Sequence, residues 1–181
     1  GTSLPATAFF LRRRETITRV YVHDAGIWHH PTTRAYFHIF TGAFIVFAGL
    51  KTAAIAGHIR PDGDCVGSCL ATYNYITTYY PQIEVSLYLQ PIPNIFKFMK
   101  NADKIISDCT ADKEFDLFIA QDCGDLGRLG DAAKYFEHAK KTACIDHHIS
   151  NQSFADENYI FPQASSASEL VLLLYTSDAA D

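Results

Sequence analysis

The residues best suited to chemistry lie in one short stretch, His58-Ile-Arg-Pro-Asp62-Gly-Asp64. One imidazole and two carboxylates fall within these seven residues. Such a set offers the mixed nitrogen and oxygen ligands that divalent transition metals take. An Asp-Gly-Asp turn alone is typical of solvated acidic turns. The histidine in front of it, together with acidic groups later in the chain, favours a metal site.

Two further acidic groups follow later apolar segments. Asp122 follows the segment Asp116–Gln121, and Asp146-His147-His148 follows Thr142–Ile145. In a parallel sheet the carboxyl ends of all strands meet at one edge, where such folds bind their ligands. The side chains can then converge on two metal ions about 3.5–4 Å apart that share a carboxylate. We predict that Asp122 is this bridge, because it stands alone on the middle loop.

The pattern from Lys51 onward predicts alternating strands and helices. The predicted strands are Thr52–Gly57, Ile83–Leu89, Lys104–Ile106, Asp116–Gln121 and Thr142–Ile145. The predicted helices are Val66–Tyr80, a short one from Asn94 through Met99, Asp131–Lys140 and Ala164–Tyr175. This alternation indicates an α/β fold with a doubly wound, mainly parallel sheet.

The two ends of the chain do not follow this pattern. Residues 1–50 are interpreted as a poorly determined extension, whose last part, Ala43–Lys51, is predicted to be a helix leading into the first strand. Ile39–Leu50 is apolar but too short to span a bilayer comfortably, and a re-entrant or signal-anchor segment is the alternative. Residues 176–181 are interpreted as a non-native-looking tail, with a frayed natural terminus as the alternative.

Composition limits the classes of function. The chain has 181 residues, enough for one α/β domain, and a net charge of −5. It therefore has no basic field that attracts long nucleic acid. The five cysteines include no Cys-x-x-Cys pair, which favours reduced thiols and a cytoplasmic protein. Cys65 and Cys69 are predicted to be small core residues.

Several motifs together resemble a known family. They are His58-Ile-Arg-Pro-Asp-Gly-Asp64, Gln121-Asp122 and Ile145-Asp146-His-His148. These resemble the motifs of the DHH phosphoesterases, in the RecJ-like superfamily. Asn151-x-x-Phe154-x-Asp156-x-Asn158 is similar to the branch of bifunctional oligoribonuclease/pAp phosphatases, the nanoRNases. The segment Ala164–Glu169 is similar to that branch too, with Ala167 where the branch has Thr. The resemblance covers roughly residues 51–175.

The resemblance implies a centre of two Mn²⁺ ions, with Mg²⁺ or Co²⁺ as alternatives. The ligands it implies are His58 and Asp62 for one ion, Asp64 and His147 for the other, and Asp122 as the bridge. It further implies that Asp146 orients the histidines and that His148 contacts the scissile phosphate. Water then attacks phosphorus in line while both ions stabilise the developing charge.

The resemblance leaves the substrate contacts open. Arg128 either pairs with a phosphate or is an ordinary surface arginine. Ser165 and Ser166 either bind phosphate or cap the last helix, and capping is the favoured interpretation.

The resemblance implies hydrolysis of short oligoribonucleotides, of 3′-phosphoadenosine 5′-phosphate, or of both. The alternatives are a cyclic-dinucleotide phosphodiesterase, a manganese pyrophosphatase and an inactive nucleotide- or metal-binding fragment. The pyrophosphatase typically carries Thr where Gly63 stands. We expect a short RNA or nucleotide as the partner, no long nucleic acid, no membrane, and a homodimer as an open alternative for the full-length protein.

The family pattern also includes a later metal-binding Asp and a smaller, Gly-rich C-terminal substrate-binding domain. Neither is recognisable in this sequence, so residues 51–175 are interpreted as the N-terminal part of a DHH domain. We expect the isolated chain to be poorly soluble, to bind Mn²⁺ weakly at its second site and to be nearly inactive.

Overall fold

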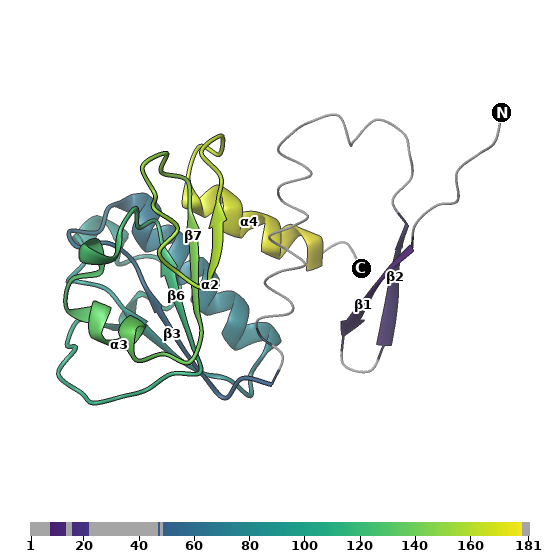
Figure 1. The fold of residues 1–181 in the computed structure, drawn as a ribbon, viewed down its shortest axis with the longest axis horizontal. Coiled ribbons are helices and arrows are strands. Elements are labelled where there is room, and N and C mark those ends of the chain that lie inside the picture. Colours follow the sequence, from purple (N-terminus) through teal and green to yellow (C-terminus); the bar gives the residue numbers. More distant parts are fainter. Residues whose placement is uncertain (1–7, 14–15, 22–46, 48, 179–181) are drawn as a thin grey trace. The chain divides into compact units, whose positions relative to one another are not determined.

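The computed structural model describes residues 8–13, 16–21, 47 and 49–178. The chain divides into two compact units, Gly1–Ala35 and Tyr36–Asp181, which are described separately (Figure 1). In the first unit, β1 (Ala8–Arg13) pairs antiparallel with β2 (Thr16–Tyr21). This hairpin was not predicted, because the sequence of β1 does not alternate apolar and polar residues. Most of the helix predicted at Ala43–Lys51 lies outside the described residues.

The second unit contains a six-stranded parallel sheet in the order β5-β4-β3-β6-β7-β8. Its strands are β3 (Thr52–Ala56), β4 (Glu84–Tyr88), β5 (Ile105–Ile106), β6 (Leu117–Gln121), β7 (Thr142–Asp146) and β8 (Glu157–Ile160). The predicted parallel α/β fold is therefore confirmed. Edge strand β8 was not predicted, because its sequence, Glu-Asn-Tyr-Ile, is half exposed and only partly apolar.

Strand β3 is the first strand of this sheet along the chain, yet it lies in its middle. The strands β4 and β5 extend the sheet on one side of β3, and β6, β7 and β8 extend it on the other. The direction of winding therefore reverses between β3 and β6. Parallel sheets of this kind bind ligands at the carboxyl ends of the strands beside such a reversal.

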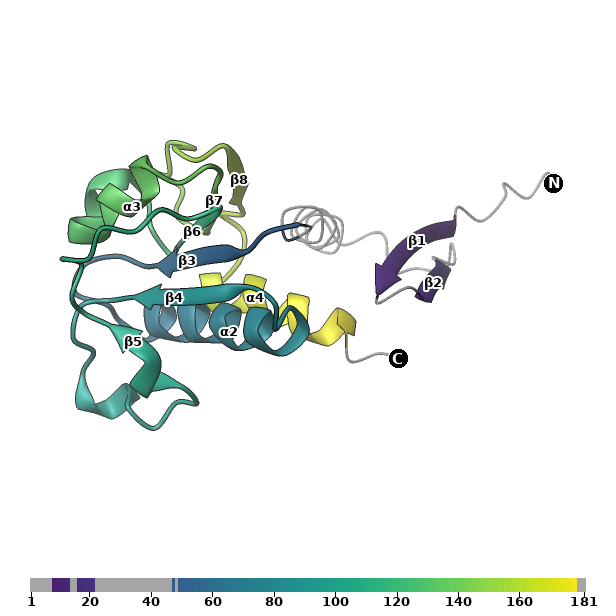
Figure 2. The same cartoon turned by 90° about the horizontal axis from the view of Figure 1, so that it is seen from below.

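Helices cover both faces of the sheet (Figure 2). The helices α2 (Gly63–Tyr79) and α4 (Ala167–Asp178) pack on one face, over a core that includes Ile55, Leu87 and Ile119. The 3₁₀ helix η4 (Leu126–Ala132) and α3 (Ala133–Glu137) lie over the other face. Short 3₁₀ turns, η2 and η3, occupy Asn94–Phe96 and Ala102–Lys104. Buried on both faces, the central strands are continuous apolar runs, as parallel strands commonly are.

Local side chains explain why some helix boundaries differ from prediction. Helix α2 begins at Gly63 rather than Val66, because the Asp62 carboxylate caps it by accepting hydrogen bonds from the N–H groups of Asp64 and Cys65 at 3.0 and 3.1 Å. The helix predicted at Asp131–Lys140 is instead the end of η4 followed by α3, and Gly130, at φ +57°, forms a kink within η4.

Helix α4 also differs from prediction at both ends. It starts at Ala167 rather than Ala164 and continues to Asp178, past the predicted end at Tyr175. The predicted tail therefore begins within this helix, and residues 179–181 lie outside the described residues. Within the part of the chain that the structure describes, no helix combines the length and apolar character needed to cross a membrane.

Two similar Asp–Thr pairs join neighbouring strands at their amino ends. The Asp116 carboxylate, just before β6, accepts a hydrogen bond from the Thr52 N–H at 3.1 Å, and the Thr52 hydroxyl accepts one from the Asp116 N–H at 3.0 Å. Asp156, just before β8, pairs in the same way with Thr142 of β7. These pairs set the alignment of the strands, and hence the relative heights of the carboxyl ends that carry the acidic loops.

Candidate metal centre

The sequence-predicted ligands come together at the carboxyl edge of the sheet. His58 lies just after β3, and Asp122 follows β6 directly. Asp146 is the last residue of β7, and His147 follows it. Asp64 comes from the first turn of α2, which starts on the same edge. Strands β3 and β6 flank the reversal in winding, so His58 and Asp122 occupy the position where this fold class places ligands.

Asp122 lies at the middle of this group. Its side chain is buried, and its backbone has φ +50°, a left-handed conformation that non-glycine residues rarely adopt. Its Oδ2 lies 3.5 Å from His58 Nε2, and its Oδ1 lies 3.6 Å from His147 Nε2. Oδ1 has no hydrogen-bond partner among the described residues. The two oxygens therefore face two histidines from different loops.

His58 is held with one ring nitrogen directed into the centre. Its Nδ1 lies 2.9 Å from the Ile59 carbonyl, which can only accept a hydrogen bond, so Nδ1 carries a proton and Nε2 is the nitrogen left to face the centre. This Nε2 faces Asp122 and lies 3.8 Å from Asp62 Oδ1. Carbonyl partners of this kind commonly orient metal-binding histidines.

The second group of side chains contains Asp64 and His147. His147 Nε2 lies 3.5 Å from Asp64 Oδ2. The Asp64 carboxylate also accepts hydrogen bonds from the N–H groups of Ala167 and Ser168, at 2.8 and 2.7 Å. These N–H groups belong to the first turn of α4, whose dipole favours a negative charge there. Helix α4 thus orients the Asp64 carboxylate.

The electrostatics of the centre reflect several close acidic groups. Burial, and then the charge of Asp64, raises the pKa of Asp122 to about 6. The Cys65 side chain, the Ile59 carbonyl and the Asp122 charge raise the pKa of His58 to about 9, against the effect of burial. Both pKa shifts indicate that added positive charge stabilises this group of side chains. A bound cation supplies such charge.

The spacing of these atoms fits a pair of divalent ions. The nitrogen–oxygen distances of 3.5–3.8 Å are too long for hydrogen bonds. Two ligands that bind one ion at about 2.0–2.3 Å lie about 3–4 Å apart, which matches these distances. The unpartnered, buried Oδ1 of Asp122 is also explained if it faces a cation. Asp122 is thus shared by two groups of side chains that could each hold a metal ion.

Asp146 is turned away from these two sites and holds the neighbouring side chains. It is fully buried, and its Oδ1 accepts hydrogen bonds from the His147 N–H at 2.8 Å and from His148 Nδ1 at 2.7 Å. Its Oδ2 accepts one from Asn151 Nδ2 at 2.7 Å. Because Nδ1 of His148 is the donor, its Nε2 remains available to a ligand.

Comparison with protein families matches residues 52–181 to the DHH family, N-terminal domain. The chain belongs to the DHH family. The resemblance inferred from the sequence motifs is thus confirmed, and Asp146-His147-His148 is the tripeptide of the family name.

Curated DHH relatives match a similar part of the chain. The probable bifunctional oligoribonuclease and PAP phosphatase NrnA of Streptococcus mutans is 29% identical over 124 residues, which are 66% of this chain and 37% of that protein. The bifunctional oligoribonuclease and PAP phosphatase NrnA of Bacillus subtilis is 27% identical over 124 residues, 68% of this chain and 38% of that protein. The chain spans less than two fifths of the length of these relatives.

A solved structure has the same fold. The crystal structure of an exopolyphosphatase-related protein from Bacteroides fragilis superposes with a TM-score of 0.68 at 26% sequence identity. The similarity covers 80% of this chain and 44% of that one. The second unit is therefore an α/β domain like that of its DHH neighbour.

Besides His148, three residues were predicted as candidate substrate contacts, and their surroundings differ. The Arg128 carbonyl accepts a hydrogen bond from the Ile59 N–H at 2.8 Å, so its loop lies against the His58 loop. The Ser166 hydroxyl accepts a hydrogen bond from the Glu169 N–H at 2.9 Å, and Ser165 donates two to the Glu169 carboxylate. Both serines therefore cap α4, which was the favoured alternative.

Two residues near the centre were not identified as site residues from the sequence. Cys65 was assigned to the core, yet its sulfur lies near the ligand atoms of His58 and Asp122. Hydrogen bonding with Cys69, and then with His58, lowers the pKa of Cys65 to about 7. Arg60 is exposed beside the centre, at φ +55°. The sequence could have indicated both residues by their proximity to the His58–Asp64 motif, because Arg60 lies within the motif and Cys65 directly follows it.

Proposed function

We propose that this chain is the metal-binding part of a phosphoesterase that hydrolyses short oligoribonucleotides, 3′-phosphoadenosine 5′-phosphate, or both. The main observation in support is that the two carboxylate oxygens of buried Asp122 face two histidines on different loops, His58 and His147. The proposed ions are two Mn²⁺. One is held by His58, Asp62 and Asp122, and the other by Asp64, Asp122 and His147.

The residues of the chain have separate tasks in this proposal. The bound ions supply positive charge for the phosphoryl oxygens and for the developing charge of the reaction. Asp122 holds both positions at a fixed separation. Asp146 fixes the proton of His148 on Nδ1, so that His148 Nε2 is directed to a phosphate oxygen. Asp64 is held by the first turn of α4, which keeps its carboxylate oriented before any ion arrives.

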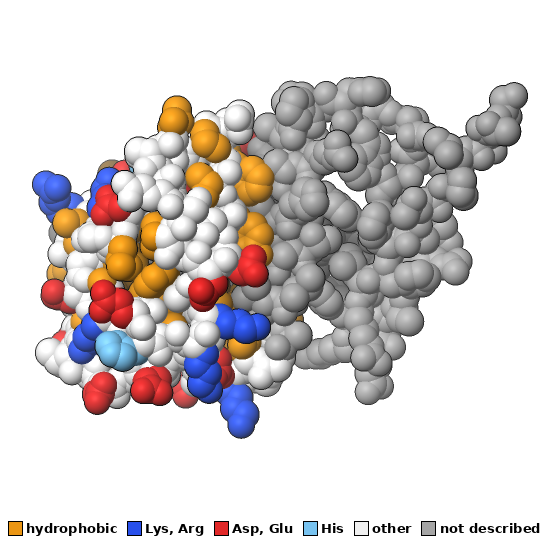
Figure 3. Space-filling view, in the orientation of Figure 1, with side chains coloured by type: hydrophobic (Ala, Val, Ile, Leu, Met, Phe, Trp, Pro, Cys, Tyr) orange, Lys and Arg blue, Asp and Glu red, His pale blue; other side chains and the backbone are white. Residues whose placement is uncertain are grey.

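Charge supports a small substrate rather than long nucleic acid. The chain has a net charge of −5, and acidic and basic side chains are mixed along the left and lower parts of the face shown in Figure 3. Two arginines are candidates for local contact with phosphate. Arg60 and Arg128 lie on loops that are joined by the hydrogen bond from the Ile59 N–H to the Arg128 carbonyl. The names of the relatives support the same substrates, and the free thiols favour a cytoplasmic location.

The activity is tested by supplying competing substrates to the same preparation. The chain is incubated with Mn²⁺ and with an RNA dinucleotide, 3′-phosphoadenosine 5′-phosphate, cyclic di-AMP or pyrophosphate. Slow hydrolysis of the first two, above a blank that contains a chelator, is the expected result. Turnover of pyrophosphate alone, or of the cyclic dinucleotide alone, contradicts the proposed substrate class. Binding of two ions without any hydrolysis contradicts catalysis by this chain.

The bridging role is tested by Asp122→Asn. The variant keeps the shape of the side chain but removes the charge shared by two cations. We expect calorimetric titration to show fewer than two Mn²⁺ sites, and any hydrolysis to fall by about 100-fold or more. Asp125→Asn is the matched control, because Asp125 lies on the same loop and caps η4 rather than facing the centre. Two unchanged Mn²⁺ sites in Asp122→Asn exclude the bridge.

A further inference from the structure

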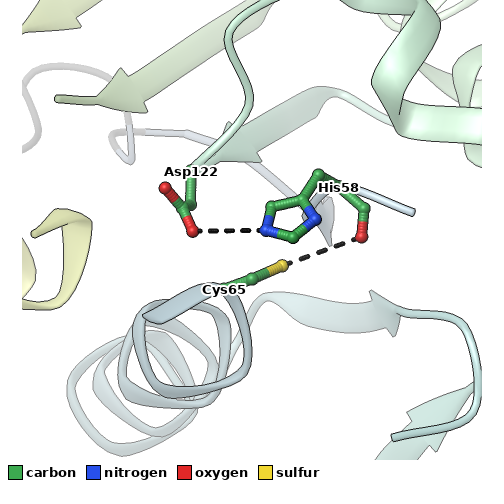
Figure 4. A group of neighbouring side chains, drawn as sticks. All are labelled: His58, Cys65 and Asp122. Carbon is green, nitrogen blue, oxygen red and sulfur yellow. Dashed lines mark hydrogen bonds and ion pairs between the residues drawn. The ribbon is translucent and has the colours of Figure 1, made fainter. Parts of the chain in front are cut away.

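A thiol lies directly beside the proposed position of the first ion. Cys65 Sγ, a ring nitrogen of His58 and a carboxylate oxygen of Asp122 all lie within 4.8 Å of one another, and all three side chains are buried. Figure 4 shows the three side chains next to one another, with Asp122 facing the His58 ring and the Cys65 sulfur facing the His58 carbonyl. Nitrogen, sulfur and oxygen donors are thus available together.

Gly57, which has no side chain, leaves the space that this sulfur occupies. A Cβ on Gly57 would lie 2.2 Å from Cys65 Sγ and 3.1 Å from Cys69 Sγ, so a residue larger than glycine fits there only if the Cys65 sulfur is displaced. The capping bond from the Cys65 N–H to Asp62 holds the first turn of α2 under the His58 loop. The sulfur donates a long hydrogen bond, 3.9 Å, to the His58 carbonyl, and it also interacts with the Cys69 and His58 side chains. Packing and these weak sulfur contacts together place it beside the His58 ring.

The donor set also indicates which ions it suits. A thiolate, an imidazole and a carboxylate form a tetrahedral set with a fourth ligand, which is the preference of Zn²⁺ and of its spectroscopic substitute Co²⁺. Mn²⁺ favours oxygen ligands and gains little from sulfur. The Asp122 oxygen on this side is Oδ2, which lies 3.5 Å from His58 Nε2, too far for a hydrogen bond but a fitting distance for two ligands of one ion. Small side-chain movements bring the three donors to bonding distance of one ion.

We propose that Cys65 is a thiolate ligand at the first metal position, and that it makes this position prefer Zn²⁺ or Co²⁺ to Mn²⁺. On binding, the S–H bond breaks, its proton passes to solvent, and the sulfur donates its electron pair to the ion. The proposal rests on the proposed metal centre, because His58 and Asp122 belong to both. It adds a sulfur ligand and a metal preference to that centre.

The test is optical and needs no catalytic activity. The 181-residue chain, reduced and kept free of oxygen, is titrated with Co²⁺ while its near-ultraviolet absorption is recorded. A thiolate bound to Co²⁺ gives an intense charge-transfer band, which nitrogen and oxygen ligands do not give. We expect this band to saturate with one equivalent and to disappear when Zn²⁺ is added. Mn²⁺ at the same concentration is expected to leave it in place.

Variants assign the band to one sulfur. Cys65→Ala and Cys65→Ser are expected to lose it and to bind Zn²⁺ about 10-fold or more weakly. Cys69→Ala is the matched control, because Cys69 is equally buried one turn further along α2, and it is expected to keep the band. Circular dichroism verifies the fold of each variant. The serine variant keeps the size of the side chain if the alanine variant unfolds.

The outcomes separate this proposal from the proposed function. If the unmodified chain binds no Co²⁺, the metal centre itself is wrong. If Co²⁺ binds with only the weak visible bands of nitrogen and oxygen ligands, the centre stands and the sulfur ligand is wrong. A charge-transfer band that survives Cys65→Ala, or that Cys69→Ala removes equally, also overturns the assignment to Cys65.

Discussion

At the scale of single residues, Asp122 at the middle of the centre has an energetically unfavourable conformation and environment. Asp122 combines a left-handed backbone with a buried carboxylate oxygen that has no hydrogen-bond partner. Each feature alone costs of order 1–3 kcal/mol, and features of this kind gather at functional sites. A cation bound between the histidines offsets the electrostatic part of this cost. We infer that the fold, stabilised elsewhere, holds Asp122 ready for that cation.

Asp146 is predicted to contribute mainly by holding its neighbours. In Asp146→Asn, an amide NH₂ replaces one carboxylate oxygen, yet both oxygens accept hydrogen bonds from donors in the buried site. In the variant, the new amide NH₂ group faces one of these hydrogen-bond donors and cannot accept a bond from it. The free energy of unfolding should therefore fall by about 1–3 kcal/mol. Urea denaturation of the metal-free chain measures this. Asp108→Asn, at an exposed turn, is the control, and equal effects of the two substitutions would disprove the predicted role.

At the scale of elements, the contact between β3 and α2 is tightest at Gly57. Gly57→Ala places a methyl group against the Cys65 and Cys69 sulfurs, and is expected to cost about 1–3 kcal/mol of stability. Gly63→Ala is the control, because its Cβ meets the Phe96 ring at an ordinary 3.4 Å. Denaturation of the double variant Gly57→Ala/Cys65→Ala should show partial recovery. Strict additivity of the two substitutions would exclude the predicted contact.

The pairing of β3 with β6 is predicted to depend on pH through Asp116. Hydrogen bonds from Lys140 and from the N–H groups of Lys51 and Thr52 hold the pKa of Asp116 well below its usual range. A depressed folded-state pKa adds stability above the unfolded-state pKa of about 4, and this stability is lost as pH falls further. Asp116→Asn should therefore lower the urea midpoint at pH 7 and have a smaller effect at pH 3.

A second variant separates the ion pair from the backbone bonds of Asp116. Lys140→Met removes only the 2.8 Å contact with the carboxylate, and the exposed position of Lys140 makes this contribution small. Its urea midpoint should therefore lie between those of the unmodified chain and Asp116→Asn. An effect of Asp116→Asn that is the same at both pH values would exclude the predicted pH dependence.

At the scale of the whole molecule, metal binding is predicted to stabilise the second unit. The proposed ligands come from the ends of β3, β6 and β7 and from α2, and Asp64 adds α4 through its hydrogen bonds to Ala167 and Ser168. An ion that binds only the folded chain adds about 2.7 kcal/mol at 100 times its Kd. Thermal unfolding should therefore shift upward with Mn²⁺ and return with chelator. The same shift in Asp122→Asn would show that the ions bind elsewhere.

The sequence alone determined the order of the elements and the family. Apolar runs such as Leu117–Gln121 are long enough to predict buried strands, and their alternation with helices predicts a parallel sheet. The spacing of His58, Asp62 and Asp64 lies within one loop, so a local pattern reveals it. The weakly patterned strands β1 and β8 were missed, because their sequences lack the periodicity on which such predictions depend.

Only the tertiary structure decided how these residues face one another. Asp64 and Ala167 are 103 positions apart, yet the start of α4 orients the Asp64 carboxylate. Cys65 is a core residue as predicted, and the packing of α2 under β3 also brings its sulfur to the edge of the centre. Strand register and helix packing set these distances, and both arise from contacts between distant segments. A pattern along the chain therefore indicates the candidate ligands, while the direction of each donor atom follows from the folded arrangement.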